Sequence, residues 1–120
     1  MSIGIGNIKR ALEEILVEMS GVLDSTTQPL AAGAAYTGPA FAITKYKTIV
    51  GSCYSDVAGT LRVEQRNDGA NWDVRSEFPY SAGDLMGFTV EVVGNEGRLV
   101  FVNGSSPQTT FRLYARGRKL

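Results

Sequence analysis

The chain has 120 residues, with twelve lysines and arginines against twelve aspartates and glutamates, so its formal net charge at pH 7 is zero. This length suits one domain with its own core, and the balance gives no overall field that would attract nucleic acid or an anionic membrane. The sequence has no histidine and one cysteine, which removes intrachain disulfides, the commonest metal ligand and any Ser–His or Cys–His pair. We therefore expect a protein that is not an enzyme, with no catalytic residues, no metal and no cofactor.

Residues 1–24 are expected to form an amphipathic helix that serves assembly or anchoring. Apolar residues recur there at alternating spacings of three and four, as in a heptad seam. They are Ile5, Ile8, Leu12, Ile15, Met19 and Val22. Asn7 is a suitable N-cap and Gly21 a suitable C-terminal stop, so the helix is predicted over about 8–20.

The surface that covers this helix is left open by the sequence. A helix this short needs its apolar stripe covered, either by its own domain, by a coiled coil between subunits, or by a different protein. The regular seam, widened by Leu16 and Leu23, favours self-association with more than two helices sharing a core. The seam residues are therefore the candidate oligomer interface.

Residues 25–120 are expected to form an antiparallel β-sandwich, either jelly-roll or immunoglobulin-like. Residues 24–40 are typical of a Pro/Gly-rich linker that enters a first edge strand at about 34–37. Short strands separated by turn signals follow from Ile43 onward, which is the pattern of an all-β sandwich. The strands are predicted at 47–54, 59–66, 72–80, 86–94, 98–103 and 108–115.

The turn "NDGANW" after the second of these strands is a candidate site. Asp68-Gly69 suits a hairpin reversal, and the side chains of Asp68 and Asn71 can bond local amides. Trp72 stands at an inward position of the next strand, where its apolar surface belongs in the core. The alternative is a ligand contact formed by Asp68, Asn71, Trp72 and Asp73, either with calcium or, if Trp72 faces outward, with a sugar.

Two further features bear on partners. The C-terminal stretch "RLYARGRKL" carries Arg112, Arg116, Arg118 and Lys119 with no acid, which indicates a solvated end or docking onto an acidic protein surface. Cys53 lies among apolar residues and is expected in the core. The chain shows neither an apolar run long enough to cross a membrane nor a secretory signal pattern, so we expect it to be made and kept in a cytoplasm.

Three stretches carry a family resemblance: "STTQPLAAGAAYTGPAF" at 25–41, "SDVAGTLRVEQRNDGANWDV" at 55–74 and "RLVFVNGSSPQTTFRLYARG" at 98–117. Together they resemble a small β-sandwich that recurs in virion proteins of tailed bacteriophages. The resemblance covers roughly 25–117 and carries over no catalytic residue. The chain departs from that pattern in its N-terminal heptad segment and in Arg66, where a small polar residue is commoner.

The resemblance implies a non-enzymatic bacteriophage virion structural protein, assembled in the host cytoplasm. The expected role is a capsid decoration (cement) protein that binds the outer shell as a homo-oligomer, with a trimer favoured. Its partner would be the major capsid protein or another virion protein, with no nucleic acid and no membrane. The alternative is a tail or baseplate accessory module, or a carbohydrate-binding module for host attachment that stacks sugars on Trp72, Tyr54, Tyr80 or Tyr114.

Overall fold

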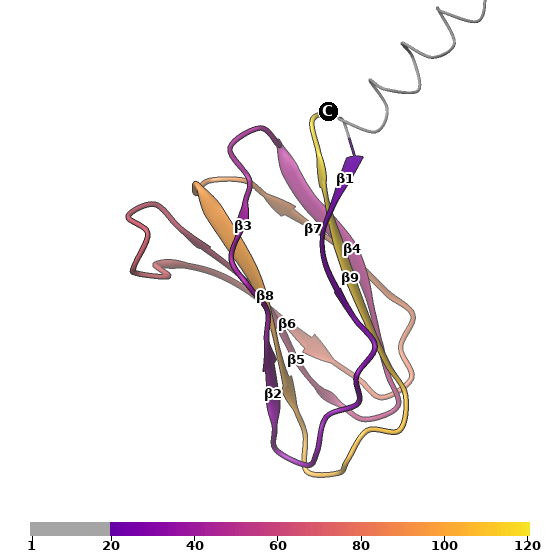
Figure 1. Cartoon of the computed structure of the whole chain (residues 1–120). Coiled ribbons are helices and arrows are strands. Elements are labelled where there is room, and N and C mark those ends of the chain that lie inside the picture. The colour runs from indigo at the N-terminus through magenta and orange to yellow at the C-terminus, as the bar shows by residue number, and fades with distance from the viewer. Residues whose placement is uncertain (1–19) are drawn as a thin grey trace, which may run out of the picture.

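The computed structural model describes residues 20–120, which form two β-sheets packed face to face (Figure 1). Sheet A contains β1 (Ser20–Thr26), β9 (Phe111–Arg118), β4 (Thr48–Ser55) and β7 (Met86–Glu91), in this spatial order. Sheet B contains β2 (Ala35–Thr37), β8 (Glu96–Asn103), β5 (Gly59–Arg66) and β6 (Val74–Tyr80), with β3 (Phe41–Ala42) also paired to β8. Every strand pair is antiparallel, which confirms the predicted sandwich.

The predicted strands agree well with the observed ones where side chains alternate. Sequence patterning placed 59–66 correctly, and the strands at 47–54 and 98–103 differ from β4 and β8 by one or two residues at their ends. The short β3 was missed, because two residues carry no periodic signal. The last strand runs to Arg118, three residues beyond the prediction, because β4 continues to pair with it as far as Thr48.

The first strand, β1, is a correction to the predicted helix boundary. Residues 21–24, which end the predicted helical segment 1–24 and include the seam residue Val22, instead pair with β9, with a bulge between Val22 and Asp24. Leu23 packs against the core, and Val22 is 63% exposed on the strand rather than part of a helical seam. The cause is tertiary, because β9 offers a free edge whose backbone groups need partners. The seam positions Ile5, Ile8, Leu12, Ile15 and Met19 lie outside the described residues.

Aromatic side chains join the two sheets at the centre of the core. Phe101 of β8 and Phe111 of β9 are both buried, with ring centroids 5.0 Å apart. Tyr80 meets the edge of Phe101 at 6.0 Å, and its hydroxyl donates to the carbonyls of Ser55 and Asp84. These contacts thus fix the position of one sheet relative to the other.

A hydrogen bond joins the two sheets at the edge where β1 and β2 lie. Asp24 on β1 of sheet A accepts a hydrogen bond from the hydroxyl of Tyr36 on β2 of sheet B, at 2.9 and 2.8 Å from its two oxygens. Burial and the neighbouring carboxylate raise the pKa of Tyr36 to about 12. The neutral phenol therefore remains a donor to Asp24 throughout the ordinary pH range.

We expect Gly51→Ala to destabilise the fold, because the β4 backbone at this position leaves no room for a side chain. A Cβ there would meet the Tyr114 carbonyl oxygen and would lie 2.5 Å from the Phe88 ring. The loss should be about 1–3 kcal/mol in the free energy of unfolding, measured by chemical denaturation. Gly87→Ala is the matched control, since the nearest atom to its Cβ is 3.7 Å away. Equal stability of the two variants would contradict the packing described here.

Candidate functional site

The outer face of sheet B carries a closed network of charges. Four arginines and three glutamates on β5, β6 and β8 form four ion pairs. The pairs are Arg62–Glu77, Arg66–Glu96, Arg75–Glu64 and Arg98–Glu64, with N–O distances of 2.8, 3.2, 2.7 and 2.8 Å. The antiparallel register sets these residues directly opposite one another, so cross-strand pairing satisfies each arginine.

Glu64 is the centre of this network. Its side chain is only 2% exposed and accepts from Arg75 on one side and Arg98 on the other. Burial raises the pKa of the Glu64 carboxyl, but the hydrogen bonds and charges of the two arginines outweigh burial and hold its pKa below the ordinary value. Glu64 thus connects β5 with β6 and β8, and removing one of its partners would leave a buried charge without full compensation.

Trp72 lies on this outer face and not in the core, which corrects the predicted inward position. Strand β6 begins only at Val74, so the inward–outward alternation does not extend back to Trp72. Its indole ring is half-buried beneath the guanidinium groups of Arg66 and Arg98, whose Cζ atoms lie 4.4 and 4.3 Å from the ring centroid. These cation–π contacts already occupy the surface on which a sugar would stack.

The turn before Trp72 satisfies its own polar groups. The Asp68 carboxylate accepts from the backbone N–H of Asn71 and of Ala70 at 2.7 and 2.8 Å, and from the Asn71 side chain at 2.6 Å. These donors lower the pKa of Asp68 to about 2. Gly69 supplies the positive φ of 76° that the reversal needs. Asp68 and Asn71 thus build the turn, and Asp73 is exposed beside it.

The outer face of sheet A is open and basic. Strict alternation along β9 puts Arg112, Tyr114, Arg116 and Arg118 outward, all of them exposed. Within residues 20–120, none of these three arginines forms an ion pair with a carboxylate. Glu91 on β7 is the one acidic residue that the strands of the described chain place on this face.

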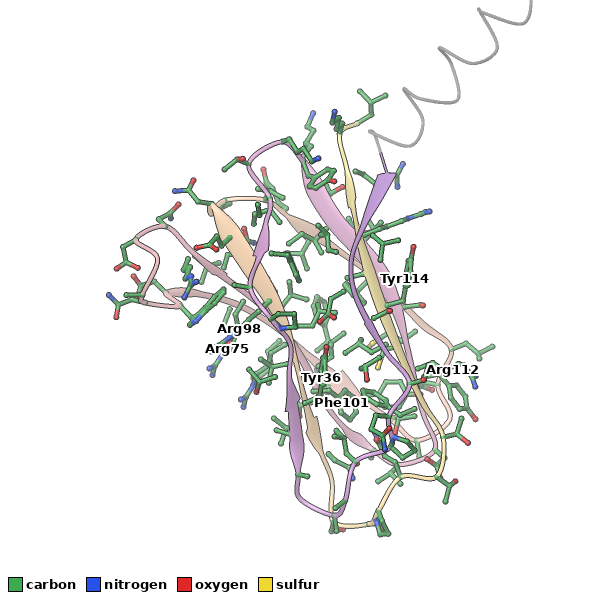
Figure 2. All side chains as sticks on the ribbon, in the orientation of Figure 1. Tyr36, Arg75, Arg98, Phe101, Arg112 and Tyr114 are labelled. Carbon is green, nitrogen blue, oxygen red and sulfur yellow. The ribbon has the colours of Figure 1, made fainter. Side chains whose placement is uncertain are left out.

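The two kinds of arginine lie on opposite sides of the molecule (Figure 2). Arg75 and Arg98 extend from sheet B on one side, and Arg112 and Tyr114 extend from sheet A on the other. The buried Phe101 lies between the two sheets.

Two adjoining hollows cross the outer face of sheet A. The larger, about 570 Å³, lies between the ends of all four strands, and its walls include Tyr54, Arg112, Tyr114 and Leu85. The second, about 460 Å³, extends past Arg116 and Arg118. Ser52, Gly87 and Tyr114 line both. We call this surface, formed by the outer sides of β9, β4 and β7 with Leu85, the arginine–tyrosine groove.

Aromatic and apolar groups give the groove its character. The Arg112 guanidinium covers the ring of Tyr54, with Cζ 4.4 Å from the centroid. Tyr114 is 38% exposed and Leu85 is 93% exposed, so both offer apolar surface to solvent. Large exposed apolar groups beside unpaired cations are typical of a binding surface.

Other chemistry-bearing groups have structural positions. Cys53 is 2% exposed, and burial raises the pKa of its thiol to about 12, so it stays protonated. Among residues 20–120, no three His, Cys, Asp or Glu side chains gather as a metal site would require. The same stretch contains no helix long and apolar enough to cross a membrane.

Residues of the phage-like motifs hold loops together. The Asp56 carboxylate accepts from the N–H groups of Thr109 and Thr110, both at 3.0 Å, and from the Thr109 hydroxyl at 2.7 Å. Gln108 donates to the Ser55 hydroxyl, at 2.9 Å. Asn103 donates to three loop carbonyls. These motif residues therefore stabilise the fold.

Sequence reasoning found only part of the arginine–tyrosine groove. It named Tyr54 and Tyr114 as platforms and grouped Arg112 with Arg116 in a basic end, predicted as either a solvated end or a site that docks onto an acidic protein surface, but it did not place them on one face of a sheet. The signal that identifies the face is the alternation of "FRLYARGR", in which every second residue is large and polar. Leu85 and Gly87 were missed, because they reach the groove only through the pairing of β7 with β4.

These features define an all-β, two-sheet antiparallel sandwich. The arginines on one outer face are paired with glutamates, and those described on the other face are not. The chain belongs to the YqxG N-terminal domain family, described as the N-terminal domain of the uncharacterised protein YqxG, whose pattern matches residues 12–117. A comparison with curated proteins gives no match.

A solved structure shares this fold, namely the crystal structure of the PBSX exported protein XepA. The two are 25% identical in sequence and superpose with a TM-score of 0.73, over 84% of this chain and 37% of XepA. The chain thus spans well under half of that protein. It resembles a protein of the phage-like element PBSX, in agreement with the phage-related resemblance of its motifs.

We expect Glu64→Gln to destabilise the protein by about 1–3 kcal/mol, because two arginines lose their shared carboxylate and a buried donor is left facing them. Glu77→Gln, which breaks an exposed pair, should cost less than about 1 kcal/mol. Since the pKa of Glu64 is lowered on folding, its contribution is complete above the ordinary glutamate pKa and fades as the pH falls through the lowered value. Denaturation curves across acid pH measure this. A difference between wild type and Glu64→Gln that did not shrink in acid would contradict it.

Proposed function

We propose that the chain is a non-enzymatic structural protein of a phage or phage-like particle, most simply a capsid decoration protein bound to the outer shell. The observation that carries this proposal is the open arginine–tyrosine groove on a rigid sandwich that resembles XepA. One face is saturated by internal ion pairs, whereas the opposite face exposes Tyr114 and three arginines that have no carboxylate partner within residues 20–120.

The positions of the reactive side chains support a non-enzymatic role. The Cys53 thiol is buried and protonated, Glu64 is held by two arginines, and the carboxylates of Asp56 and Asp68 cap backbone amides. Each contributes to folding, so none is held ready for proton transfer or nucleophilic attack.

Assembly completes the proposal. The seam of Ile5, Ile8, Leu12, Ile15 and Met19 would join copies of the chain into a homo-oligomer, with a trimer favoured. A symmetric oligomer presents several grooves at once, so modest contacts with the major capsid protein or another virion protein add up through avidity.

Purified full-length protein should co-sediment with empty shells of the phage or phage-like element that encodes it, and should raise their resistance to heat. Arg116→Glu should weaken this binding at least about tenfold, because a like charge replaces an attractive one at the contact. Lys45→Glu changes the net charge equally but lies outside the groove, and should leave binding unchanged. Absence of binding by the wild type at micromolar concentration would refute the decoration role.

The groove also favours a second candidate, a carbohydrate-binding module for host attachment. Tyr114 is exposed on its wall, whereas arginine guanidinium groups already cover the ring of Tyr54 and the indole of Trp72. The sugar-stacking hypothesis therefore moves from Trp72 to Tyr114.

If this candidate holds, Tyr114→Ala should weaken glycan binding about tenfold, and Trp72→Ala should leave it unchanged. Binding to a glycan array, followed by titration calorimetry on any sugar found, measures the effect. Loss of glycan binding on Trp72→Ala in a protein that remains folded would contradict the placement of the sugar in the groove.

A further inference from the structure

Within residues 20–120, the arginine–tyrosine groove lacks the counter-charges that the other face possesses. All four arginines on the outer face of sheet B have glutamate partners within 3.2 Å. On sheet A, the outward neighbours of Arg116 and Arg118 across the strand pairs are Val22, Val50, Ser20 and Thr48, none of them acidic. The chain is neutral overall, so this excess is local, and it calls for carboxylates supplied by a partner.

The spacing of the cations suits an extended protein segment. Alternate residues of a strand stand about 6.8 Å apart, so Arg116 and Arg118 form a row with that repeat, and Arg112 lies two repeats further along β9. Every second residue of an extended peptide has the same repeat. Arginine also presents a planar fork of donors that matches a carboxylate.

The apolar part of the groove adds an anchor to this pattern. The larger hollow lies beside Arg112 and is walled by Tyr54, Tyr114 and the exposed Leu85. A volume of about 570 Å³ accommodates a large apolar side chain with room to spare. A segment whose only contacts are carboxylates would leave the apolar wall of this hollow exposed to water. The complementary ligand therefore carries an apolar residue among its acidic residues.

We propose that the groove binds an extended acidic segment of a partner protein, whose carboxylates pair with Arg112, Arg116 and Arg118 while an apolar side chain enters the hollow between Tyr54 and Tyr114. That this contact occurs in a phage or phage-like particle rests on the proposed function. The binding itself is measured without a particle.

The probe is a fluorescein-labelled peptide of about twelve residues, longer than the eight of β9, in which glutamate alternates with serine and one central serine is replaced by leucine. Fluorescence anisotropy with the full chain should show saturable binding that weakens as salt rises. The same peptide with glutamine for glutamate should not bind. The peptide without leucine should bind severalfold more weakly.

Matched variants test the site. The triple variant Arg112→Gln, Arg116→Gln and Arg118→Gln should lose about tenfold in affinity, because each of the three exposed contacts is worth about two- to threefold. The double variant Lys45→Gln and Arg62→Gln removes cations outside the groove and should bind as the wild type does. Amide chemical shifts on peptide addition should move in β9 and β4 and stay in β5 and β6.

Every outcome in which the groove arginines do not account for peptide binding overturns the proposal. Undiminished binding by the folded triple variant, or equal loss in the control, places the peptide elsewhere. Absence of peptide binding, with arginine-dependent binding to vesicles of anionic phospholipid or to acidic glycans instead, assigns the groove to another class of partner. Shells that bind while the peptide does not would refute this inference alone. Peptide binding without shell binding would refute the decoration role and leave the acidic ligand in place.

Discussion

The packing of the two inner faces, centred on the contact of Phe101 with Phe111, is the constraint on which the rest of the molecule depends. Side chains alternate along a strand, so a residue that fills the core determines which neighbours point outward. A shift of one residue in β9 would bury Arg112 and expose Phe111. The core thus protects the outer faces from rearrangement, and a binding surface on them is as rigid as the sandwich itself.

The two outer faces use this rigidity in opposite ways. On sheet B, cross-strand register brings arginines opposite glutamates, and the buried Glu64 ties three strands together. Arg66 and Arg98 also cover Trp72, so the face is saturated. On sheet A, the cations of β9 face uncharged neighbours across the strand pairs, and within the described chain none of them pairs with a carboxylate. This difference, more than any single residue, makes sheet A the surface to which a partner is assigned.

The family match and the structural likeness concern the sandwich as a whole. The chain belongs to the YqxG N-terminal domain family and resembles XepA of the phage-like element PBSX. The motif residues behind the phage resemblance, such as Asp56, Asn103 and Gln108, hold loops together, so the motif identifies the sandwich rather than its ligand. In the role proposed above, the groove residues would decide which partner this sandwich takes.

The sequence by itself determined the class of fold and most of its strands, because alternation of apolar and polar residues over eight positions is a local signal, clearest in β5. It also determined the reversal at Asp68-Gly69. Only the tertiary structure decided that Val22 belongs to a strand, since β9 supplies its pairing, and that Trp72 lies outside, since arginines from two strands converge on it. The groove is likewise a product of pairing, because residues distant in sequence on β4, β7 and β9 become neighbours only when sheet A forms.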